Sequence, residues 1–521
     1  MNSCDKGTFE TDSNLKLQDY GEIALHSKNQ FELRLDYSVD PQDDETKFEL
    51  ESYFFIPQSF RVNQQNYSKE RFYEDMQVYI RFNPVLMTLQ EIINPKNRIS
   101  PLNRAVKLLK GIFGGDTSVN TLTQIIHELK MLAVIVTASI EKHTESICTL
   151  LQIENLTHQN LLDTKKQAKS LLEQIQAFNF AFQKKRNEFL TPFTPIEVKE
   201  TFDFVLEYIS IFIQAELTKI LNFLTKEIPL SGDFTDSIEL IKILLKKERD
   251  FRSACGFTSV LNKNEENEEF PYRYSILKKF ISNVLYLKAR PEPSPRVIKE
   301  MTYAAAAGIA MLIAVLLTYF VQLLFEDYTL PFITALVVSY MIKDRLKDWL
   351  KIIFGQEGTY RKSYDYKSTL KDNEGNIIGY SKEDFCFIKK IPQDIMNQRS
   401  SSHLTKIEGE GRPENIIRYV KSIKLFPKTI SKYHTRVLNT SDIIRFDVTN
   451  FLSKIEDPYN LYQWYNIENQ QVELINAARV YHLNFVVKFT HHSLNGKITD
   501  VDRVRFILDK KGIKRIETEF L

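Results

Sequence analysis

A chain of 521 residues is too long for one ordinary hydrophobic core, so roughly two to four domains are expected. Hydrophobic residues make up 43% and charged residues 26% of the chain, which is typical of folded protein and excludes a wholly disordered one. The formal net charge of +2 disfavours a general nucleic-acid-binding protein, and four scattered cysteines without a CxxC pair disfavour a disulfide framework or a zinc ribbon.

The first part of the chain, residues 1–115, is expected to form an α+β region. Residues 30–39 and 47–56 each alternate apolar with polar side chains, and the polar loop DPQDDET lies between them. This pattern predicts a strand pair, most simply a hairpin. A helix is predicted over residues 101–113, because Ser100 suits the N-cap, a proline suits the first helical position and Gly114 ends the pattern.

The segment 53–82 reads YFFIPQSFRVNQQNYSKERFYEDMQVYIRF. Within it, Ser68 precedes a stretch that we predict to be helical as far as about Phe82. The YFFIP strand end, the YSKE helix start and the FYEDMQVYIRF helix resemble a segment of an uncharacterised bacterial two-helix membrane protein family. The resemblance covers only this segment; it implies a bacterial membrane protein and assigns no catalytic residue.

Residues 116–290 are predicted to form a helical bundle or coiled-coil region. Residues 117–191 contain neither glycine nor proline, and a seam of mostly apolar positions recurs at alternating steps of four and three. The pattern falters near residues 155–160, so one long helix and two shorter helices both remain open. The seam positions are Leu122, Ile126, Leu129, Ala133, Val136, Ile140, His143, Ile147 and Leu150, and then Leu161, Thr164, Ala168, Leu171, Ile175, Phe178 and Phe182. Such a seam predicts long helices packed side by side, within the chain or across a homo-oligomer. Further helices are predicted over residues 201–226, 237–253 and 272–289.

A transmembrane hairpin is predicted over residues 302–342, after a proline-rich linker at residues 291–301. Residues 303–325 carry no charge over 23 residues, and about 34 Å of helix is enough to cross a hydrocarbon core of about 30 Å. Residues 329–342 are marginal at about 21 Å, so a second crossing and a re-entrant segment both remain open. Small residues four apart on the first helix predict the close approach of another helix: Ala306, Ala310 and Ala314.

Charges around the hairpin predict its orientation. The tip carries the adjacent acids Glu326 and Asp327, expected in a solvated turn, and no lysine or arginine, whereas both outer flanks are basic. Both termini are therefore expected in the cytoplasm, with the chain a multi-pass protein of the cell inner (cytoplasmic) membrane. Residues 343–355 are predicted as an amphipathic juxtamembrane helix. Its expected membrane-interface residues are Lys343, Arg345, Lys347, Trp349 and Lys351.

The C-terminal part, residues 356–521, is expected to form a β-rich cytoplasmic domain. Residues 481–490 mostly alternate apolar with polar side chains, and residues 503–517 predict a strand, a turn and a second strand. Gly512 suits the left-handed backbone conformation that such a turn requires. Residues 443–448 are a further candidate strand.

No motif assigns a catalytic residue, a cofactor site or a metal site. His127 and Glu128 begin like a zincin motif, but Met131 stands where the second histidine would lie. His143 is expected as a packed seam residue, and the adjacent pair His491–His492 would point to opposite faces of a strand. The glycine-bearing loop EGEGRPEN at residues 408–415 is expected as a surface loop, with anion binding through backbone N–H groups as the alternative.

These features favour an α+β membrane protein that serves as a membrane-anchored cytoplasmic scaffold or sensor. Its expected partners are the lipid bilayer and unidentified proteins, with no nucleic acid and no cofactor. Two alternatives remain open: a membrane-tethered enzyme with its site in the C-terminal domain, and a component of an oligomeric channel or transporter. The scarcity of polar residues inside the predicted hairpin disfavours a transport pathway.

Overall fold

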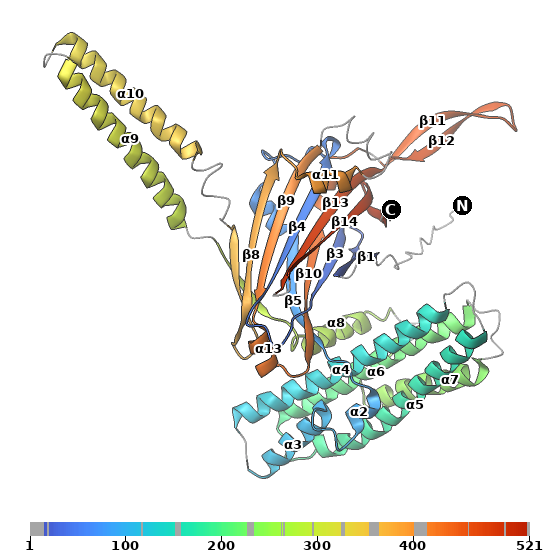
Figure 1. Cartoon of the computed structure of the whole chain (residues 1–521). Helices are drawn as coiled ribbons and strands as arrows, with labels where there is room; N and C mark the ends of the chain where they lie inside the picture. Colours follow the sequence, from blue (N-terminus) through green and yellow to red (C-terminus); the bar gives the residue numbers. More distant parts are fainter. Residues whose placement is uncertain are drawn as a thin grey trace. The chain divides into compact units, whose positions relative to one another are not determined.

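The chain divides into two compact units, drawn in the computed structural model of Figure 1. The sheet unit comprises Met1–Ile80, Lys288–Ile430 and Asp442–Leu521, and the helical unit comprises Arg81–Leu287 and Ser431–Ser441. The structure describes residues 15–17, 20–115, 118–151, 158–226, 234–261, 263, 266–293, 296–324, 329–353, 364–400, 414–456, 458–493 and 496–517. Helices and large sheets together confirm the α+β class.

Two large β-sheets carry most strands of the fold. The strands of the smaller sheet are β1 (Leu15–Leu17), β2 (Gly21–Ser27), β3 (Gln30–Tyr37), β5 (Met76–Pro84) and β10 (Val437–Asp447). Those of the larger sheet are β4 (Thr46–Pro57), β6 (Lys288–Pro293), β7 (Tyr366–Lys371), β8 (Ile377–Ile388), β9 (Glu414–Leu425), β13 (Tyr481–Ser493), β14 (Gly496–Asp509) and β15 (Gly512–Glu517). The strand orders are β1-β2-β3-β10-β5 and β15-β14-β13-β4-β9-β8-β7-β6. The larger sheet is antiparallel throughout.

Aromatic side chains from both sheets form the core of the sheet unit. The ring of Phe54 on β4 lies 5.0 Å from that of Phe446 on β10, and the ring of Phe31 on β3 lies 5.6 Å from that of Phe485 on β13. Every second side chain of β3 is buried, as the alternating sequence predicts. The periodicity of the sequence therefore identifies the core-facing side chains correctly on this strand.

The predicted hairpin between the first two alternating segments is wrong. Both segments are strands, but β3 pairs with β2 whereas β4 pairs with β9 and β13. The two strands face each other from different sheets, and the rings of Tyr37 and Phe48 lie 4.7 Å apart between them. Alternation determines which face of a strand is buried, and it leaves the hydrogen-bonding partner undetermined.

The predicted helix from Ser68 to about Phe82 is also only partly correct. Ser68 caps helix α1 (Lys69–Glu74) by accepting a hydrogen bond from the backbone N–H of Arg71. The helix ends at Glu74, and β5 begins at Met76. Residues 76–82 place methionine, valine, isoleucine and phenylalanine at alternate positions, which is the period of a strand. These residues therefore form β5 and do not continue the helix.

The predicted proline-rich linker is in part a strand. Residues 288–293 form β6, the edge strand of the larger sheet, where Pro291 is paired with Ser368 and Pro293 with Tyr366 of β7. Proline lacks a backbone donor and is tolerated in a sheet only at such an edge. The rest of the predicted linker, residues 296–301, is helical, because helix α9 (Arg296–Leu324) begins before the predicted start of the hairpin at residue 302.

The C-terminal segment is β-rich, as predicted. It holds β7 to β9 and β11 to β15, with β11 (Tyr459–Asn466) and β12 (Gln471–Ala478) forming a separate two-stranded sheet. The predicted turn between β14 and β15 is present, and Gly512 adopts a φ of 136° there. These strands do not form a sheet of their own, because β4 from the N-terminal segment lies between β9 and β13. Among the described residues of this segment, three short helices interrupt the strands: α11 (Gln393–Arg399), α13 (Pro427–Tyr433) and α14 (Thr449–Leu452).

The helical unit consists mainly of long helices that pack around α4. Its helices are α2 (Leu89–Ile93), α3 (Pro101–Phe113), α4 (Val119–Leu151), α5 (His158–Phe189), α6 (Ile196–Lys226), α7 (Thr235–Ala254) and α8 (Glu269–Ser282). Of the two alternatives for residues 117–191, the structure supports two helices, because α4 and α5 are separate elements that pack against each other. Residues 155–157 of the suspected break lie outside the described residues.

The heptad seam is buried more completely in α5 than in α4. From Thr164 to Phe182 all the predicted α5 positions are buried, whereas in α4 the buried set includes Ile140 but Ile126 is only half-buried. Neighbouring Ile125 is fully buried instead. In α4, packing against α3, α5 and α6 widens the buried face beyond a two-position seam, as expected for a globular bundle and not for a coiled coil.

Candidate functional site

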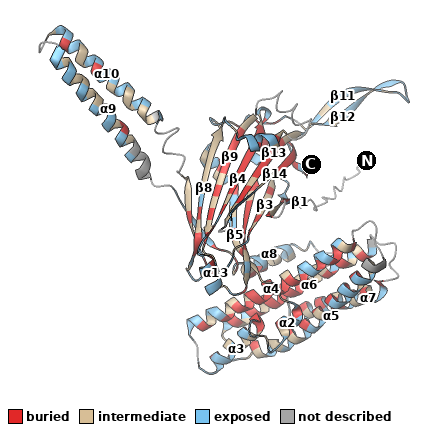
Figure 2. Ribbon diagram, in the orientation of Figure 1, coloured by how far each residue is buried: buried red, intermediate tan, exposed pale blue. Residues whose placement is uncertain are grey.

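The helical hairpin of α9 and α10 (Leu330–Ile353) is the first candidate functional element. Among the described residues, two helices are long and apolar enough to cross a membrane: α4 and the segment Tyr303–Leu324 of α9. They differ in burial, because 67% of the apolar window is buried in α4 and only 17% in α9. Figure 2 shows this contrast, with α4 largely buried and α9 and α10 largely exposed. By this measure α4 is a core helix, and α9 is the helix with an uncovered apolar surface.

Large apolar side chains cover the outside of both hairpin helices. The exposed ones are Met301, Ile309, Met311, Leu312, Val315, Leu316, Tyr319, Phe320, Leu323 and Leu324 on α9, and Leu330, Ile333, Val337, Val338, Tyr340, Met341, Ile342, Trp349 and Ile353 on α10. Soluble monomeric proteins seldom expose a contiguous apolar patch of this kind, because contact with water is unfavourable by about 25 cal/mol for each Å². A hydrocarbon environment removes that cost.

The inner face of the hairpin is lined by small side chains. Ala306 and Ala310 are fully buried, and Ala314 is half-buried. On α10, Ser339 and Phe332 are the buried residues. The predicted close approach of a second helix is confirmed, since α9 packs against α10 of the same chain.

The two helices have charge-free stretches of different length. The Lys351 Nζ atom on α10 lies 5.9 Å from the ring centroid of Tyr303 on α9, so these two residues mark the same level of the hairpin. From that level toward the tip, Tyr303–Leu324 is free of charge over about 33 Å, whereas α10 is free of charge only over residues 330–342, about 20 Å. The charged end of α10 therefore lies beside the alanine-rich start of α9.

The predicted interface residues all lie on this charged end of α10. Lys343 is mostly buried by its neighbours: its Nζ lies 3.6 Å from the Tyr340 ring centroid and 3.7 Å from an Asp344 carboxylate oxygen. Lys347 and Lys351 are half-buried, while Arg345 is exposed and Trp349 is 64% exposed. The helix runs without interruption from Leu330 to Ile353, so the predicted juxtamembrane helix is the last part of α10 itself. Glu326 and Asp327 at the tip lie outside the described residues.

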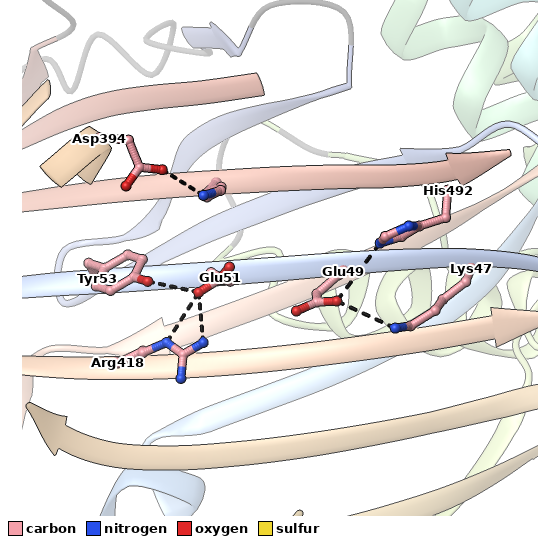
Figure 3. Close-up of polar contacts among 8 residues, drawn as sticks. Lys47, Glu49, Glu51, Tyr53, Asp394, Arg418 and His492 are labelled. Atoms are coloured by element: carbon pink, nitrogen blue, oxygen red, sulfur yellow. Dashed lines mark hydrogen bonds and ion pairs between the residues drawn. The ribbon is translucent and has the colours of Figure 1, made fainter. Parts of the chain in front are cut away.

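A charged network covers the outer face of the larger sheet. The Glu51 carboxylate accepts hydrogen bonds from the Arg418 guanidinium at 2.8 and 3.1 Å and from the Tyr53 hydroxyl at 2.7 Å (Figure 3). Burial opposes ionisation of Glu51, but these hydrogen bonds outweigh it and lower the pKa of the carboxyl. Further along the same strand, Glu49 faces Lys47 at 3.5 Å and His492 at 4.0 Å. The network is self-neutralising, and its geometry fits a structural role.

Two carboxyl groups on β8 have raised pKa values. Burial, and then the negative charge of Asp365, raise the pKa of Asp384 to about 6. Burial also raises the pKa of Glu383 on the core-facing side of the same strand. The neighbouring thiol of Cys386 likewise has a pKa raised by burial, which lowers its reactivity as a nucleophile. Among the described residues, Cys148, Cys255 and Cys386 form no disulfide, and Cys4 lies outside these residues.

A fully buried ion pair joins the two sheets. The Lys421 Nζ on β9 lies 2.6 Å from one carboxylate oxygen of Asp442 on β10, and the Tyr37 hydroxyl on β3 donates to the same carboxylate at 2.9 Å. Burial raises the pKa of Tyr37 well above its usual value, so the hydroxyl stays protonated and remains a donor. These three side chains satisfy one another in the core. Sequence reasoning missed them, because only the fold brings them together.

No family model, no curated protein and no solved structure matches this chain.

The histidines of the sequence occupy separate structural settings. The carboxylate of Glu128, beside His127, receives two hydrogen bonds of 2.5 and 2.6 Å from Arg436, which is a buried structural pair. The His491 ring stacks on Phe48 at 4.6 Å, whereas His492 points toward Glu49, so the two rings take opposite faces as predicted. Among the described residues, no group of three His, Cys, Asp or Glu side chains is arranged to hold a metal ion.

His143 is placed differently from the prediction of a packed seam residue. It is exposed and lines a groove of about 650 Å³ in the helical unit. Its Nδ1 lies 2.7 Å from the Ser139 carbonyl oxygen, which fixes that nitrogen as the N–H donor and turns Nε2 into the acceptor of the neutral ring. Lys142, Lys166 and Glu91 share the groove with serine hydroxyls and apolar side chains, so its lining is mixed in charge and favours no one class of ligand. The loop at residues 408–415, expected at the surface with anion binding as the alternative, lies outside the described residues as far as residue 413.

Proposed function

We propose that this chain is a membrane-anchored scaffold of the bacterial inner membrane, held by the hairpin of α9 and α10 with both termini in the cytoplasm. The observation that carries the proposal is the continuous exposed apolar surface of this hairpin, in contrast with the buried surface of α4. The bilayer is the partner whose chemistry matches that surface. The two folded units would then provide the surfaces on which cytoplasmic proteins assemble.

Strand pairing supports the same-side placement of the two hairpin ends. The hairpin lies in the connection between β6 and β7, which are neighbouring antiparallel strands of one sheet. Pro293, close before α9, is paired with Tyr366, which follows α10. A chain that leaves a sheet and returns to the adjacent strand must begin and end its membrane excursion on one side. This argument is independent of the lysine and arginine count at the flanks.

The depth of insertion follows from the shorter apolar stretch. About 20 Å of α10 is free of charge, compared with about 30 Å of hydrocarbon in an ordinary bilayer. Lys343 and Lys347 have long apolar stems that let their ammonium groups reach the headgroup region from deeper positions. Local thinning of the bilayer, at a fraction of a kcal/mol per Å, accounts for the remaining mismatch. On this arrangement the alanine-rich start of α9 and the charged end of α10 share the cytoplasmic interface.

Membrane fractionation tests the anchor directly. We expect the full chain to stay in the membrane pellet after an alkaline carbonate wash, and a Leu312→Gln, Leu316→Gln, Phe320→Gln variant to move into the soluble fraction. A matched control replaces three exposed apolar residues of the helical unit, Ile243→Gln, Tyr272→Gln and Ile276→Gln, and should remain in the pellet. Release of the unaltered chain by carbonate would show that the hairpin is not a membrane anchor.

The position of Trp349 provides a second readout of the same anchor. In a Trp464→Phe variant, Trp349 is the single tryptophan of the chain. Because its ring is exposed on the charged end of α10, we expect brominated lipids in liposomes to quench its fluorescence, as for a ring at the headgroup boundary. Unquenched, blue-shifted emission that persists in detergent would place the ring inside the protein.

A further inference from the structure

The two-stranded sheet of β11 and β12 has no buried residue in either strand. Its strands pair only with each other among the described residues, from Tyr459 opposite Ala478 to Asn466 opposite Gln471. In Figure 1 they form a long ribbon near the C-terminal strands. A ribbon of two strands is marginally stable in water on its own, and three or more strands are usually needed for independent stability.

Apolar side chains are exposed on both faces of this ribbon. Their exposed fractions run from 42% to 78%, for Tyr459, Leu461, Tyr462, Trp464, Tyr465, Ile467, Val472, Leu474 and Ile475. The strand register places Leu461, Tyr465, Val472 and Leu474 on one face, and that face carries no charged residue. The opposite face carries Glu473 as its one charge within the paired strands.

The outer edge of β11 also differs from three other strand edges of this protein, those of β6, β15 and β1. The edge strand β6 reads KARPEP, with two prolines and three charges, and the opposite edge strand β15 reads GIKRIE, with three charges. The edge strand β1 is only three residues long. Prolines, charges and shortness are the devices by which proteins prevent strand edges from pairing with other chains. In contrast, β11 reads YNLYQWYN, eight residues without a charge, a proline or a glycine.

The unpaired backbone of this edge restricts what can cover it. Lipid hydrocarbon offers no hydrogen bond to the free N–H and C=O groups of an open strand edge, so open edges do not enter the bilayer core. The two acids of the β11–β12 ribbon, Glu468 and Glu473, further disfavour contact with an anionic lipid surface. What satisfies both the backbone groups and the apolar side chains is another β-strand of similar composition.

We propose that β11 is an assembly edge that pairs with β11 of a second copy of this chain. The two strands would run antiparallel about a twofold axis near Tyr462 and Gln463, the middle of β11, and would join the two ribbons into one four-stranded sheet. This arrangement sets the acids of the two copies apart, because each Glu473 lies on the outer strand β12. Pairing through β12 would instead bring the two β12 strands, and with them the two Glu473 carboxylates, closer together. The repulsion between these charges disfavours β12 as the pairing edge. The proposal does not depend on the membrane anchor.

Matched lysine variants of the full chain in detergent test the proposal. Leu461→Lys with Tyr465→Lys places two charges on β11, and Val472→Lys with Leu474→Lys places two charges on the same face of β12. Mass should be followed by light scattering over roughly 1–100 μM, the range in which a small strand-edge interface dissociates. We expect the unaltered chain and the β12 variant to form dimers, and the β11 variant to dissociate at concentrations at least about tenfold higher than either.

Three results would overturn the proposal. One is an unaltered chain that is monomeric throughout this range; another is a β12 variant that dissociates as readily as the β11 variant. The third is a lipid contact: in a Trp349→Phe variant, quenching of Trp464 by brominated lipid would place β11 at a membrane. Circular dichroism of each variant shows whether its fold is intact. If the β11 variant is unfolded, oxidative cross-linking of a Gln463→Cys chain, compared with an Asn469→Cys chain, still decides the matter, because only the strand centre lies at the twofold axis.

Discussion

At the scale of single residues, the carboxyl group of Asp384 makes the stability of the sheet unit depend on pH. Its pKa is about 6 in the folded chain, because burial and Asp365 disfavour its charge, against about 3.9 in an unfolded chain. The folded state therefore holds this proton more tightly, and the corresponding stability is present below about pH 4 and is lost as the pH rises toward 6.

This sign leads to the first prediction. We expect Asp384→Asn to raise the free energy of unfolding at pH 7.5 by about 1–2 kcal/mol, a value reduced for partial solvent screening, and to leave it unchanged near pH 4. Thermal unfolding of the full chain in detergent at both pH values measures the difference. Asp394→Asn is the control, because its ion pair with Lys488 at 2.6 Å lowers the pKa of Asp394 and should give the opposite sign at pH 7.5. Equal effects of Asp384→Asn at both pH values would contradict the assignment.

The buried pair Lys421–Asp442 should be strongly coupled. Lys421→Met leaves the fully buried Asp442 carboxylate with the Tyr37 hydroxyl but without its cation, and we expect a loss of about 3–5 kcal/mol in unfolding free energy. Adding Asp442→Leu to this variant should recover part of the loss, because the unpaired charge is then removed as well. Chemical unfolding of the two variants measures the coupling. A double variant at least as unstable as Lys421→Met would show that the ion pair is not the source of the effect.

Residues differ in how far the sequence reveals them. Lys343 to Lys351 stand out because charges next to an apolar run are visible locally, and the structure places them together on one helix end. Tyr37 and Asp442 are 405 positions apart, and Lys421 and Asp442 belong to different sheets, so nothing local marks them as partners. The sequence therefore reveals candidate membrane-interface residues and leaves the buried polar contacts hidden.

At the scale of elements, periodicity predicts burial better than it predicts partners. The α5 positions of the seam and the alternate residues of β3 are buried as expected, since both depend on spacing alone. The prediction that β3 and β4 form a hairpin is wrong because strand pairing depends on residues far away in the chain. The predicted helix after Glu74 is wrong because the short apolar pattern of this segment fits either a helix or a strand. Pairing within a sheet makes it a strand.

The helical unit allows a sharp comparison between two seam positions. Ile140 is fully buried on α4, whereas Ile126, at an equivalent position of the repeat, is half-buried. We expect Ile140→Asp to destabilise the chain by several kcal/mol, because it buries a charge without a partner, and Ile126→Asp to cost distinctly less. Thermal melting followed by circular dichroism at 222 nm measures both. Similar melting temperatures for the two variants would mean that the α4 seam is not packed as described.

At the scale of the whole molecule, the two ends of the chain build common sheets. β4 lies between β9 and β13, so the larger sheet cannot be completed until the C-terminal strands are available. The sequence predicts the helical segment, the apolar hairpin and the β-rich C-terminal segment, because each has a distinctive local composition. It does not predict that the first 80 residues and the last 80 share one compact unit, since that depends on strand pairing over hundreds of residues.

The same pairing gives the topology prediction. The hairpin is an insertion between the paired strands β6 and β7, so both of its ends belong to one sheet, and the proposed anchor puts them on one side of the membrane. The basic flanks predict that this side is the cytoplasm, and the acids Glu326 and Asp327, costly inside hydrocarbon, predict that the tip reaches the opposite surface. In intact cells, a membrane-impermeant maleimide should label an Asp327→Cys chain, and should label an Asn469→Cys chain only after permeabilisation. The unaltered chain, with its native cysteines, is the background control. Labelling of Asp327→Cys only after permeabilisation would show that the hairpin turns back within the bilayer, and labelling of Asn469→Cys in intact cells would reverse the orientation.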